Sequence, residues 1–257
     1  MKILLLSTSV GSGHVRAAQA VGASFAGVCP DCEVRSFDLL DYANPLFKLV
    51  YARLYLKIAT SFPNVFEAMY EKSDKPWKDN RRREVLAQIN IRGLEEQIVD
   101  YAPDVIVSTH FLASDLISRM KKKEKISAKL AVVVTDMDMH AWWLCRRADH
   151  YFISRDEMRE YLRLLGVPAE NVTIAGIPID SKFSIQYEKS EIRQQLGLRT
   201  DLTTFLVTSG GDSCGPTMRI VEQLSQVKKP SQFVVVCGRN EKLKTRLDEY
   251  VASGSPA

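Results

Sequence analysis

The sequence predicts an α/β protein with a mostly parallel, doubly wound sheet, and two observations support this class. Strand-length apolar runs alternate with helical patterns from the first residue onward. The first run, Ile3 to Ser9, leads through the turn Gly11-Ser-Gly-His14 into a helix that opens at Val15. Such a turn is typical of the ligand-binding end of a strand in an open sheet, because glycines let the backbone turn sharply and approach a ligand closely.

The first part of the chain contains five predicted strands and four predicted helices. Strands are expected where short apolar runs such as Leu130-Ala-Val-Val-Val134 stand between turns, and helices where apolar residues recur at helical spacing. The strands are residues 2–8, 33–37, 104–108, 130–135 and 150–154, and the helices are residues 14–26, 84–101, 112–123 and 156–165.

A second α/β unit is predicted to follow. Residues 175–179 are expected to form a strand end and linker, and the helix after Glu188 is expected to end at Gly197. A strand at 203–207, a helix from Pro216 and a strand at 232–237 follow.

The chain therefore divides near residue 180, into an N-terminal lobe of residues 1–180 and a second lobe of residues 181–257. Residues 200–257 number 58, whereas a domain most often holds ~100–150 residues. Two strands covered by two helices would leave an open edge and half a core. We expect this second lobe to be truncated.

Composition indicates a soluble globular protein, with 46% hydrophobic and 26% charged residues. The apolar runs are too short to cross a bilayer, and the N-terminus lacks the features of a secretory signal, which predicts a cytoplasmic protein. Five cysteines, an odd number, fit a reducing compartment. Cys29-Pro-Asp-Cys32 has the spacing of half a zinc site or a redox pair, but nothing nearby completes it, so we expect two free thiols.

The net charge of +4 is concentrated in Arg81-Arg82-Arg83 and in Lys121-Lys122-Lys123 with Lys125. Such runs are usually solvated helix faces. Gathered on one side of a lobe, they would attract the protein to anionic lipid by about 1 kcal/mol per residue. Nucleic acid is not expected as a partner, because we find no recognition helix, RNA-binding strand motif or zinc module.

Two aromatic stripes interrupt the α/β pattern. Phe47, Tyr51 and Tyr55 recur at intervals of four residues, and the same step separates Phe66 from Tyr70. Core packing explains such stripes by default. The alternative is an apolar surface that takes up a lipid or lies in the membrane interface.

His14 is the candidate catalytic residue of the first turn. It is the only side chain there with a pKa suited to moving a proton near neutral pH. The alternative is a histidine that merely caps the helix.

Six segments, in this order, resemble the diacylglycerol glycosyltransferases, which include bacterial processive diacylglycerol glucosyltransferases and plant monogalactosyldiacylglycerol synthases. These are relatives of the peptidoglycan lipid-intermediate glucosaminyl transferase. The resemblance covers nearly the whole chain. The segments are Gly11–Ala18, Thr135–Trp143, Asp149–Ile153, Gly176–Phe183, Ser209–Pro216 and Cys237–Leu243.

The resemblance implies a GT-B fold, with a complete N-terminal Rossmann-like lobe and an incomplete C-terminal one. The first lobe would bind diacylglycerol and an anionic membrane surface, and the second would bind a UDP-hexose. The implied reaction is hexose transfer to diacylglycerol with inversion, without a metal or a cofactor other than the donor substrate. Its place would be the cytosolic face of a membrane, with the protein bound peripherally.

The resemblance also implies roles for individual residues. His14 would be the base, and Asp136 would orient it or hold it protonated, unless Asp136 only caps its turn. His140 would lie in the acceptor loop as a second base candidate or as a residue packed on Trp142 or Trp143, while His110 and His150 are taken as structural. The implied acceptor set is Gly13, His140, Trp143, Tyr51 and Tyr55, and the donor set is Ser209, Gly210, Gly211, Gly215, Gly238, Arg239 and Asn240.

Two departures from the family pattern stand out. Ser209 and Ser213 occupy positions where glycine is expected, and Ser213 would crowd a pyrophosphate if its φ is positive. The family's Pro-Gly-Gly turn and ribose-binding acidic residue would fall beyond residue 257. Two other functions therefore stay open: a truncated relative that binds membrane or acceptor without turnover, and a sugar-nucleotide epimerase on the same fold. The aromatic stripes and His140-Ala-Trp-Trp143 disfavour the epimerase.

Overall fold

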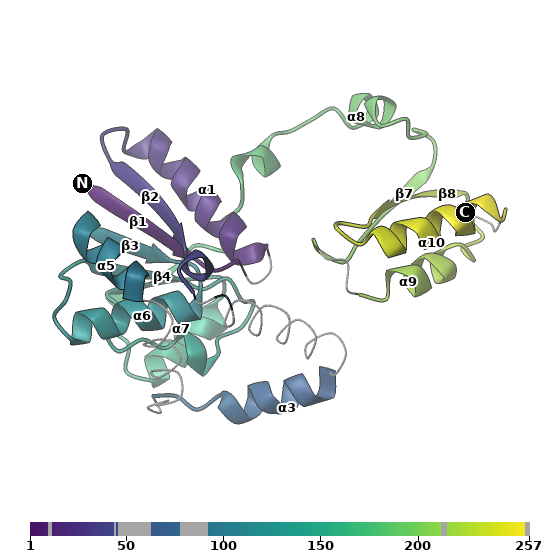
Figure 1. The fold of residues 1–257 in the computed structure, drawn as a ribbon. Coiled ribbons are helices and arrows are strands. Elements are labelled where there is room, and N and C mark those ends of the chain that lie inside the picture. Colours follow the sequence, from purple (N-terminus) through teal and green to yellow (C-terminus); the bar gives the residue numbers. More distant parts are fainter. Residues whose placement is uncertain (10–11, 44, 46–62, 78–91, 212–214, 255–257) are drawn as a thin grey trace. The chain divides into compact units, whose positions relative to one another are not determined.

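The computed structural model of the chain describes residues 1–9, 12–43, 45, 63–77, 92–211 and 215–254 (Figure 1). The chain forms two compact units, Met1–Phe183 and Ser184–Ala257. The roles assigned to the two lobes from the sequence stay predictions.

The first unit is built on one sheet of six parallel strands in the order β2-β1-β3-β4-β5-β6. Leu4 of β1 lies between Arg35 of β2 and Ile106 of β3 in the register of the sheet. The strands are β1 (Lys2–Ser7), β2 (Glu33–Asp38), β3 (Val105–Ser108), β4 (Lys129–Val133), β5 (His150–Ile153) and β6 (Val172–Ile174).

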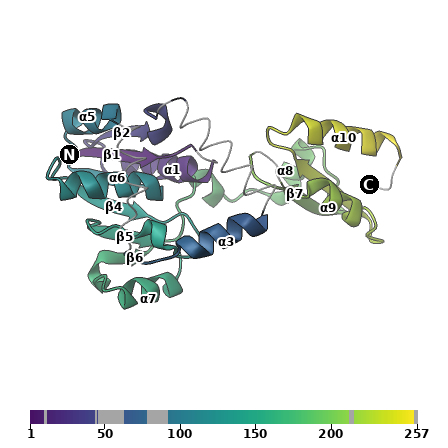
Figure 2. The ribbon, with the colours of Figure 1, turned by 60° about the horizontal axis from the view of Figure 1, so that its bottom comes forward.

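Helices cover both faces of this sheet, as the doubly wound prediction requires (Figures 1 and 2). The α-helices of the unit are α1 (Gly13–Val28), α3 (Pro63–Ser73), α5 (Arg92–Tyr101), α6 (Phe111–Lys122) and α7 (Asp156–Leu164). Short 3-10 turns add η1 (Leu39–Asp41), η2 (Ala141–Trp143), η3 (Ala169–Asn171) and η4 (Ser181–Ser184).

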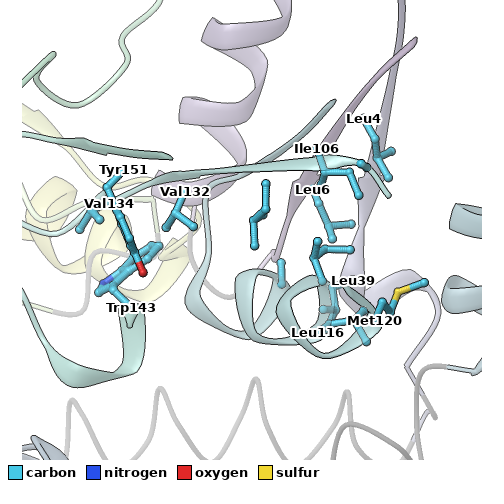
Figure 3. Close-up of a cluster of buried hydrophobic side chains, with 14 of the residues drawn as sticks. Leu4, Leu6, Leu39, Ile106, Leu116, Met120, Val132, Val134, Trp143 and Tyr151 are labelled. Atoms are coloured by element: carbon cyan, nitrogen blue, oxygen red, sulfur yellow. The ribbon is translucent and has the colours of Figure 1, made fainter. Parts of the chain in front are cut away.

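The alternation of side chains along β1 divides the core into two layers. Leu4 and Leu6 face the larger layer, which receives apolar side chains from α5, α6 and α7 and contains the buried rings of Trp143 and Tyr151 (Figure 3). Ile3 and Leu5 face the smaller layer, which is covered by α1. Apolar side chains therefore anchor β1, the strand that precedes the His14 turn, from both faces of the sheet.

The second unit contains two parallel strands, β7 (Thr203–Thr208) and β8 (Ser231–Val236), among its described residues. Helices α8 (Lys189–Gln195), α9 (Thr217–Leu224) and α10 (Glu241–Ala252) accompany them. A small core of Val207, Val221, Leu243 and Leu247 joins β7 to α9 and α10.

Most predicted elements are confirmed within a few residues of their predicted bounds, and the position of one is corrected. Residues 175–179 were expected to hold a strand end, but the sixth strand lies just before them at Val172–Ile174. Its three residues are too few for an alternation pattern to be visible. Residues 84–91 of the predicted helix 84–101 lie outside the described residues, and α5 covers the remainder.

The prediction of two free thiols at Cys29 and Cys32 is wrong, because the structure joins them in a disulfide. The tight turn after α1 brings their Cα atoms to 5.4 Å, within the range that a disulfide needs. Among the described residues, Cys145 and Cys237 form no disulfide.

Candidate functional site

The candidate site lies where the strand order of the first sheet reverses. The chain passes from β1 outward to β2 and then returns to the other side of β1 as β3. In an open parallel sheet, ligands bind at the carboxyl ends of strands at such a switch point. His14 lies in the first turn of α1, the first helix after β1. Thr109 directly follows β3. Thr135 follows the next strand, β4.

Contacts fix the ring of His14 through its Nδ1 atom. Nδ1 lies 2.8 Å from the carbonyl oxygen of Thr109 and 2.8 Å from Oγ1 of Thr135. The Thr109 hydroxyl in turn donates to the carbonyl oxygen of His14 at 2.9 Å. Because a carbonyl oxygen can only accept, the Thr109 contact requires the proton on Nδ1. In the neutral ring, Nε2 is then the atom that can accept a proton.

Burial lowers the pKa of His14 below its ordinary value of 6.5, and this effect outweighs the Thr109 carbonyl and the charge of Asp136, which both raise it. The ring is therefore mainly neutral at pH 7. A neutral imidazole with a vacant Nε2 has the form that a general base needs.

Asp136 is held by Trp143 rather than by His14. The indole Nε1 of Trp143, whose ring is fully buried, donates to Oδ2 of Asp136 at 2.6 Å. Asp136 acts on His14 through its charge. The two candidate catalytic residues are thus electrostatically coupled, and the predicted acceptor residue Trp143 is the residue that fixes the carboxylate.

His140 uses both ring nitrogens for structural contacts. Nδ1 accepts from the backbone N–H of Trp142 at 3.1 Å, which caps η2, and Nε2 donates to the carbonyl oxygen of Tyr70 at 3.0 Å. The ring is buried and stacks on Tyr70 with centroids 3.9 Å apart. Of the two open interpretations, the packed loop residue describes His140, and its contacts leave no nitrogen for a second base.

The other two histidines also hold structural positions. His110 caps α6 by accepting from the N–H of Leu112 at 3.1 Å, and its ring meets that of His14 edge to face at 4.4 Å. His150 lies on β5 with Nε2 2.8 Å from Oγ1 of Thr173. The structural interpretation of both residues agrees with these contacts.

The predicted acceptor residues divide between described and undescribed parts of the chain. Gly13 is the exposed first residue of α1, with open space where a Cβ would stand. Tyr70 of the second stripe packs on the η2 loop, in accord with the default explanation for such stripes. Gly11, Phe47, Tyr51 and Tyr55 lie outside the described residues.

The predicted donor residues form a second cluster at the carboxyl ends of β7 and β8. The N–H of Arg239 donates to the carbonyl oxygen of Gly211 at 2.8 Å, which joins the turns after the two strands. Gly238 has a φ of +53°, and a Cβ there would lie 2.2 Å from the same carbonyl oxygen. Only glycine fits at this position, because the two backbones touch.

Polar side chains complete these turns. The Ser209 hydroxyl lies 2.6 Å from that of Thr217, and Asn240 caps α10 by accepting from the N–H of Leu243 at 3.0 Å. Gly215 lies close to Ser209, since a Cβ on it would come within 2.9 Å of the Ser209 hydroxyl oxygen. All seven predicted donor residues are therefore neighbours, while Ser213 lies outside the described residues.

A groove of about 510 Å³ lies beside these turns, between the starts of α9 and α10. Its lining includes the cationic side chains Arg219, Lys242 and Arg246 and one carboxylate, Glu222, so positive charge is in excess. Positive charge and helix starts favour an anionic ligand.

A model of the monogalactosyldiacylglycerol (MGDG) synthase family matches residues 14–179, more than half of the chain. The chain belongs to this family. The match begins at His14 and includes Thr109, Thr135, Asp136 and Trp143.

Curated relatives agree with this assignment. A processive diacylglycerol beta-glucosyltransferase of Bacillus mycoides is 28% identical over 256 residues, which are 100% of this chain and 65% of the relative. The enzyme of the same name from Bacillus cereus strain B4264 is 28% identical over 96% of this chain and 62% of the relative. The chain thus spans somewhat less than two thirds of the length of these relatives.

Solved structures confirm the predicted GT-B fold class. Anabaena Alr3699/HepE, solved with UDP and glucose, matches with a TM-score of 0.54, 15% identity, and coverage of 99% of this chain and 66% of that chain. The UDP-GlcNAc 2-epimerase from Neisseria meningitidis, solved with UDP-GlcNAc, matches with a TM-score of 0.54, 14% identity, and coverage of 98% and 70%. Identities this low show the fold alone.

Thr109 and Thr135 are site residues that the sequence did not reveal as such. Their contacts with His14 span 95 and 121 positions along the chain. The one available signal was their position, because Thr109 directly follows the predicted strand 104–108 and Thr135 is the last residue of the predicted strand 130–135, as expected for polar residues of a sheet-edge site.

The lysine cluster lies at the other edge of the sheet from His14, since α6 begins after the end of β3 and runs back toward the start of β4. Lys121 forms an ion pair with Asp149, and Lys125 pairs with Glu95 at 2.7 Å. These two lysines are thus partly neutralised within the unit. The arginine run 81–83 lies outside the described residues.

The described residues contain neither a candidate membrane span nor a candidate metal cluster. None of the helices there has both the length and the apolar character that a bilayer crossing requires. No group of three or more His, Cys, Asp and Glu side chains is placed there to hold a metal ion.

Proposed function

We propose that this protein transfers a hexose from a UDP-hexose to the hydroxyl of diacylglycerol. Membership of the family gives the class of reaction. The observation that carries the proposal is the contact of His14 Nδ1 with the Thr109 carbonyl oxygen, 2.8 Å, because it reserves Nε2 as a proton acceptor at the switch point of the sheet.

The chemistry is a single displacement. Nε2 of His14 takes the proton of the acceptor hydroxyl while that oxygen bonds to the anomeric carbon. The bond between this carbon and the phosphate oxygen breaks on the opposite face, and UDP leaves with the electron pair. One displacement through an oxocarbenium-like state inverts the configuration of the sugar.

The second unit supplies the donor site in this proposal. Backbone N–H groups of the turns after β7 and β8, the starts of α9 and α10, and the cationic side chains of the adjacent groove would stabilise the diphosphate of departing UDP. This arrangement needs no metal ion, so transfer is expected to proceed in the presence of EDTA.

Helix α3 is the candidate for contact with the lipid surface at the cytosolic face of a membrane. Val65 and Met69, one helical turn apart, are 52% and 56% exposed. Tyr70, on the same helix, packs on His140 of the η2 loop. Apolar exposure near the acceptor loop supports peripheral binding by this helix better than the lysine cluster, which lies at the opposite edge of the sheet.

A second candidate function is binding of the membrane or the acceptor without turnover. It needs only the first unit, where the exposed apolar side chains of Val65 and Met69 lie on α3. The epimerase alternative shares the fold, but the family model that matches residues 14–179 favours transfer to a lipid.

The decisive experiment incubates the protein with vesicles containing diacylglycerol and with radiolabelled UDP-glucose or UDP-galactose, in parallel samples with and without EDTA. Labelled glycolipid in both samples is the expected product, and inverted anomeric configuration is checked by NMR. Co-sedimentation with vesicles but no product would favour the binding function. Product that disappears with EDTA would overturn metal independence alone.

A further inference from the structure

The ring of His14 can serve as a base only in one of its two neutral forms. With the proton on Nδ1, Nε2 accepts a proton from a substrate, whereas with the proton on Nε2 it cannot. Two protein oxygens select between these forms. The carbonyl oxygen of Thr109 and Oγ1 of Thr135 both lie 2.8 Å from Nδ1.

The hydroxyl of Thr135 has one arrangement that satisfies all of its contacts. It donates its proton to the Thr109 carbonyl oxygen at 3.4 Å, which turns a lone pair of Oγ1 toward His14. Nδ1–H then donates to Oγ1 and to the carbonyl oxygen together. The opposite arrangement, with Thr135 donating to a bare Nδ1, would place the ring lone pair against the Thr109 carbonyl oxygen at 2.8 Å.

We propose that Thr135 is a positioning residue, whose hydroxyl fixes the angle of the His14 ring and so keeps Nδ1–H on the Thr109 carbonyl oxygen that selects this form. This inference rests on the proposed function for its catalytic meaning, but the preference for one form is a property of the chain itself. Thr135 joins the end of β4 to the start of α1, so the ring is held from two elements that do not neighbour each other in sequence.

Other groups also face the ring. The edge-to-face ring of His110, from the start of α6, lies 4.4 Å away, the Trp143 ring lies at 6.3 Å, and the Asp136 carboxylate acts through its charge. Of these, Asp136 favours the charged ring but does not choose between the two neutral forms, because no hydrogen bond joins it to either nitrogen among the described contacts. The choice falls to the two oxygens on Nδ1.

The chain offers a matched control in Thr8. It directly follows β1 at the same edge of the sheet and is fully buried, and its hydroxyl has no hydrogen-bond partner among the described residues. Thr8→Val therefore makes the same chemical change as Thr135→Val at a more deeply buried position, and no described contact joins Thr8 to His14. Replacing an unpartnered hydroxyl by a methyl group is expected to be neutral or stabilising.

The test compares Thr135→Val, Thr135→Ser and Thr8→Val by two readouts. The first is NMR of ¹³C,¹⁵N-histidine-labelled protein, whose ring shifts distinguish Nδ1–H from Nε2–H without any substrate. The second is the rate of glycolipid formation as a function of pH. Wild type, Thr135→Ser and Thr8→Val are expected to show the Nδ1–H form. Thr135→Val is expected to show a mixture, because a ring that the Thr135 hydroxyl no longer holds can turn away from the Thr109 carbonyl oxygen.

In the activity assay, Thr135→Val is expected to lower kcat by about tenfold with little change in the KM for UDP-hexose. A tenfold loss corresponds to one hydrogen bond to a ring that becomes charged during the reaction. The acid limb of its pH profile should move to lower pH, because an acceptor that stabilises the protonated ring is gone. Thr135→Ser should restore both. If Thr135 had only a structural role, the acid limb of the pH profile would stay at its wild-type position.

Each outcome decides the matter. A Thr135→Val protein with wild-type ring shifts, rate and pH limb overturns the inference, and so does an equal loss in Thr8→Val. If valine prevents folding, Thr135→Ala removes the same oxygen without adding a methyl group and is read in the same way. The protein could form no glycolipid while the NMR shifts of the His14 ring still change when the Thr135 hydroxyl is removed and return in Thr135→Ser. That outcome would support this inference and overturn the proposed function.

Discussion

The carboxyl edges of the two sheets are built from different parts of the chain. At the first edge, side chains make the site: an imidazole, a threonine hydroxyl and a carboxylate held by an indole, with contacts that span up to 121 positions. At the second edge, the backbone makes the site: glycine turns that touch each other, with a hydroxyl pair only eight positions apart. The first design suits proton transfer and the second suits holding a diphosphate.

His14→Ala is the largest expected effect and acts on the first edge alone. Loss of a general base should lower kcat about 10²- to 10⁴-fold. UDP binding, measured by calorimetry, should keep its wild-type Kd, because the donor turns belong to the other unit. Product formation at the wild-type rate would remove His14 from the base role, and a weakened Kd would show that the two edges are not independent.

Gly238→Ala is the complementary change at the second edge. Its Cβ would meet the Gly211 carbonyl oxygen at 2.2 Å in a backbone of φ +53°. We expect the second unit to lose about 3 kcal/mol, from the positive φ and the backbone contact together, and UDP binding to be abolished. Hydrogen exchange of β7 and β8 measures the first effect, and calorimetry the second.

Gly197→Ala is the matched control for that change. Gly197 also has a positive φ, +68°, but no atom lies within 4 Å of the position of its Cβ. It should lose only the conformational part, about 1 kcal/mol, and retain UDP binding. Equal effects of the two substitutions would mean that the contact between the two turns has no energetic weight.

Sequence patterns predicted the two edges to different degrees. The apolar runs and glycine turns at His14, Ser209 and Gly238 were visible because each is local. The role of Thr135 was not visible, because its contact with His14 depends on which strands become neighbours in the sheet. The cap formed by His140 and the link from Trp143 to Asp136 span only two and seven positions, but they depend on how the loop after β4 folds back on itself, which no sequence period shows. β6 was missed although a strand is a local feature, because three residues are too few to show a period.

Trp143→Phe tests whether the first edge depends on a buried polar contact. It removes the indole N–H that donates to Asp136 at 2.6 Å and is expected to lower the free energy of unfolding by about 2 kcal/mol, as for a hydrogen bond to a charged group. Urea unfolding followed by the fluorescence of Trp77 and Trp142 measures it. These tryptophans belong to the first unit, so the signal reports that unit.

A double-mutant cycle separates this contact from packing. Asp136→Ala removes both carboxylate oxygens and so the acceptor of the indole N–H, and the coupling energy between the two changes should be close to the loss seen for Trp143→Phe alone. Additive effects would mean that the loss comes from the smaller ring.

The smallest expected effect is the pH dependence of stability, and it should also separate the two units. Burial lowers the pKa of folded His14 below the ordinary 6.5, so between these two values the unfolded chain binds more protons than the folded one. Stability from this residue is therefore present in full above about pH 6.5 and is lost as pH falls through the folded pKa. Urea midpoints of wild type and His14→Gln, followed by tryptophan fluorescence from about pH 5 to 8, should converge on acidification.

All four histidines, at positions 14, 110, 140 and 150, belong to the first unit. Hydrogen exchange of β7 and β8, corrected for intrinsic rates, should accordingly show no matching change, and a parallel loss there would mean that the two units unfold together.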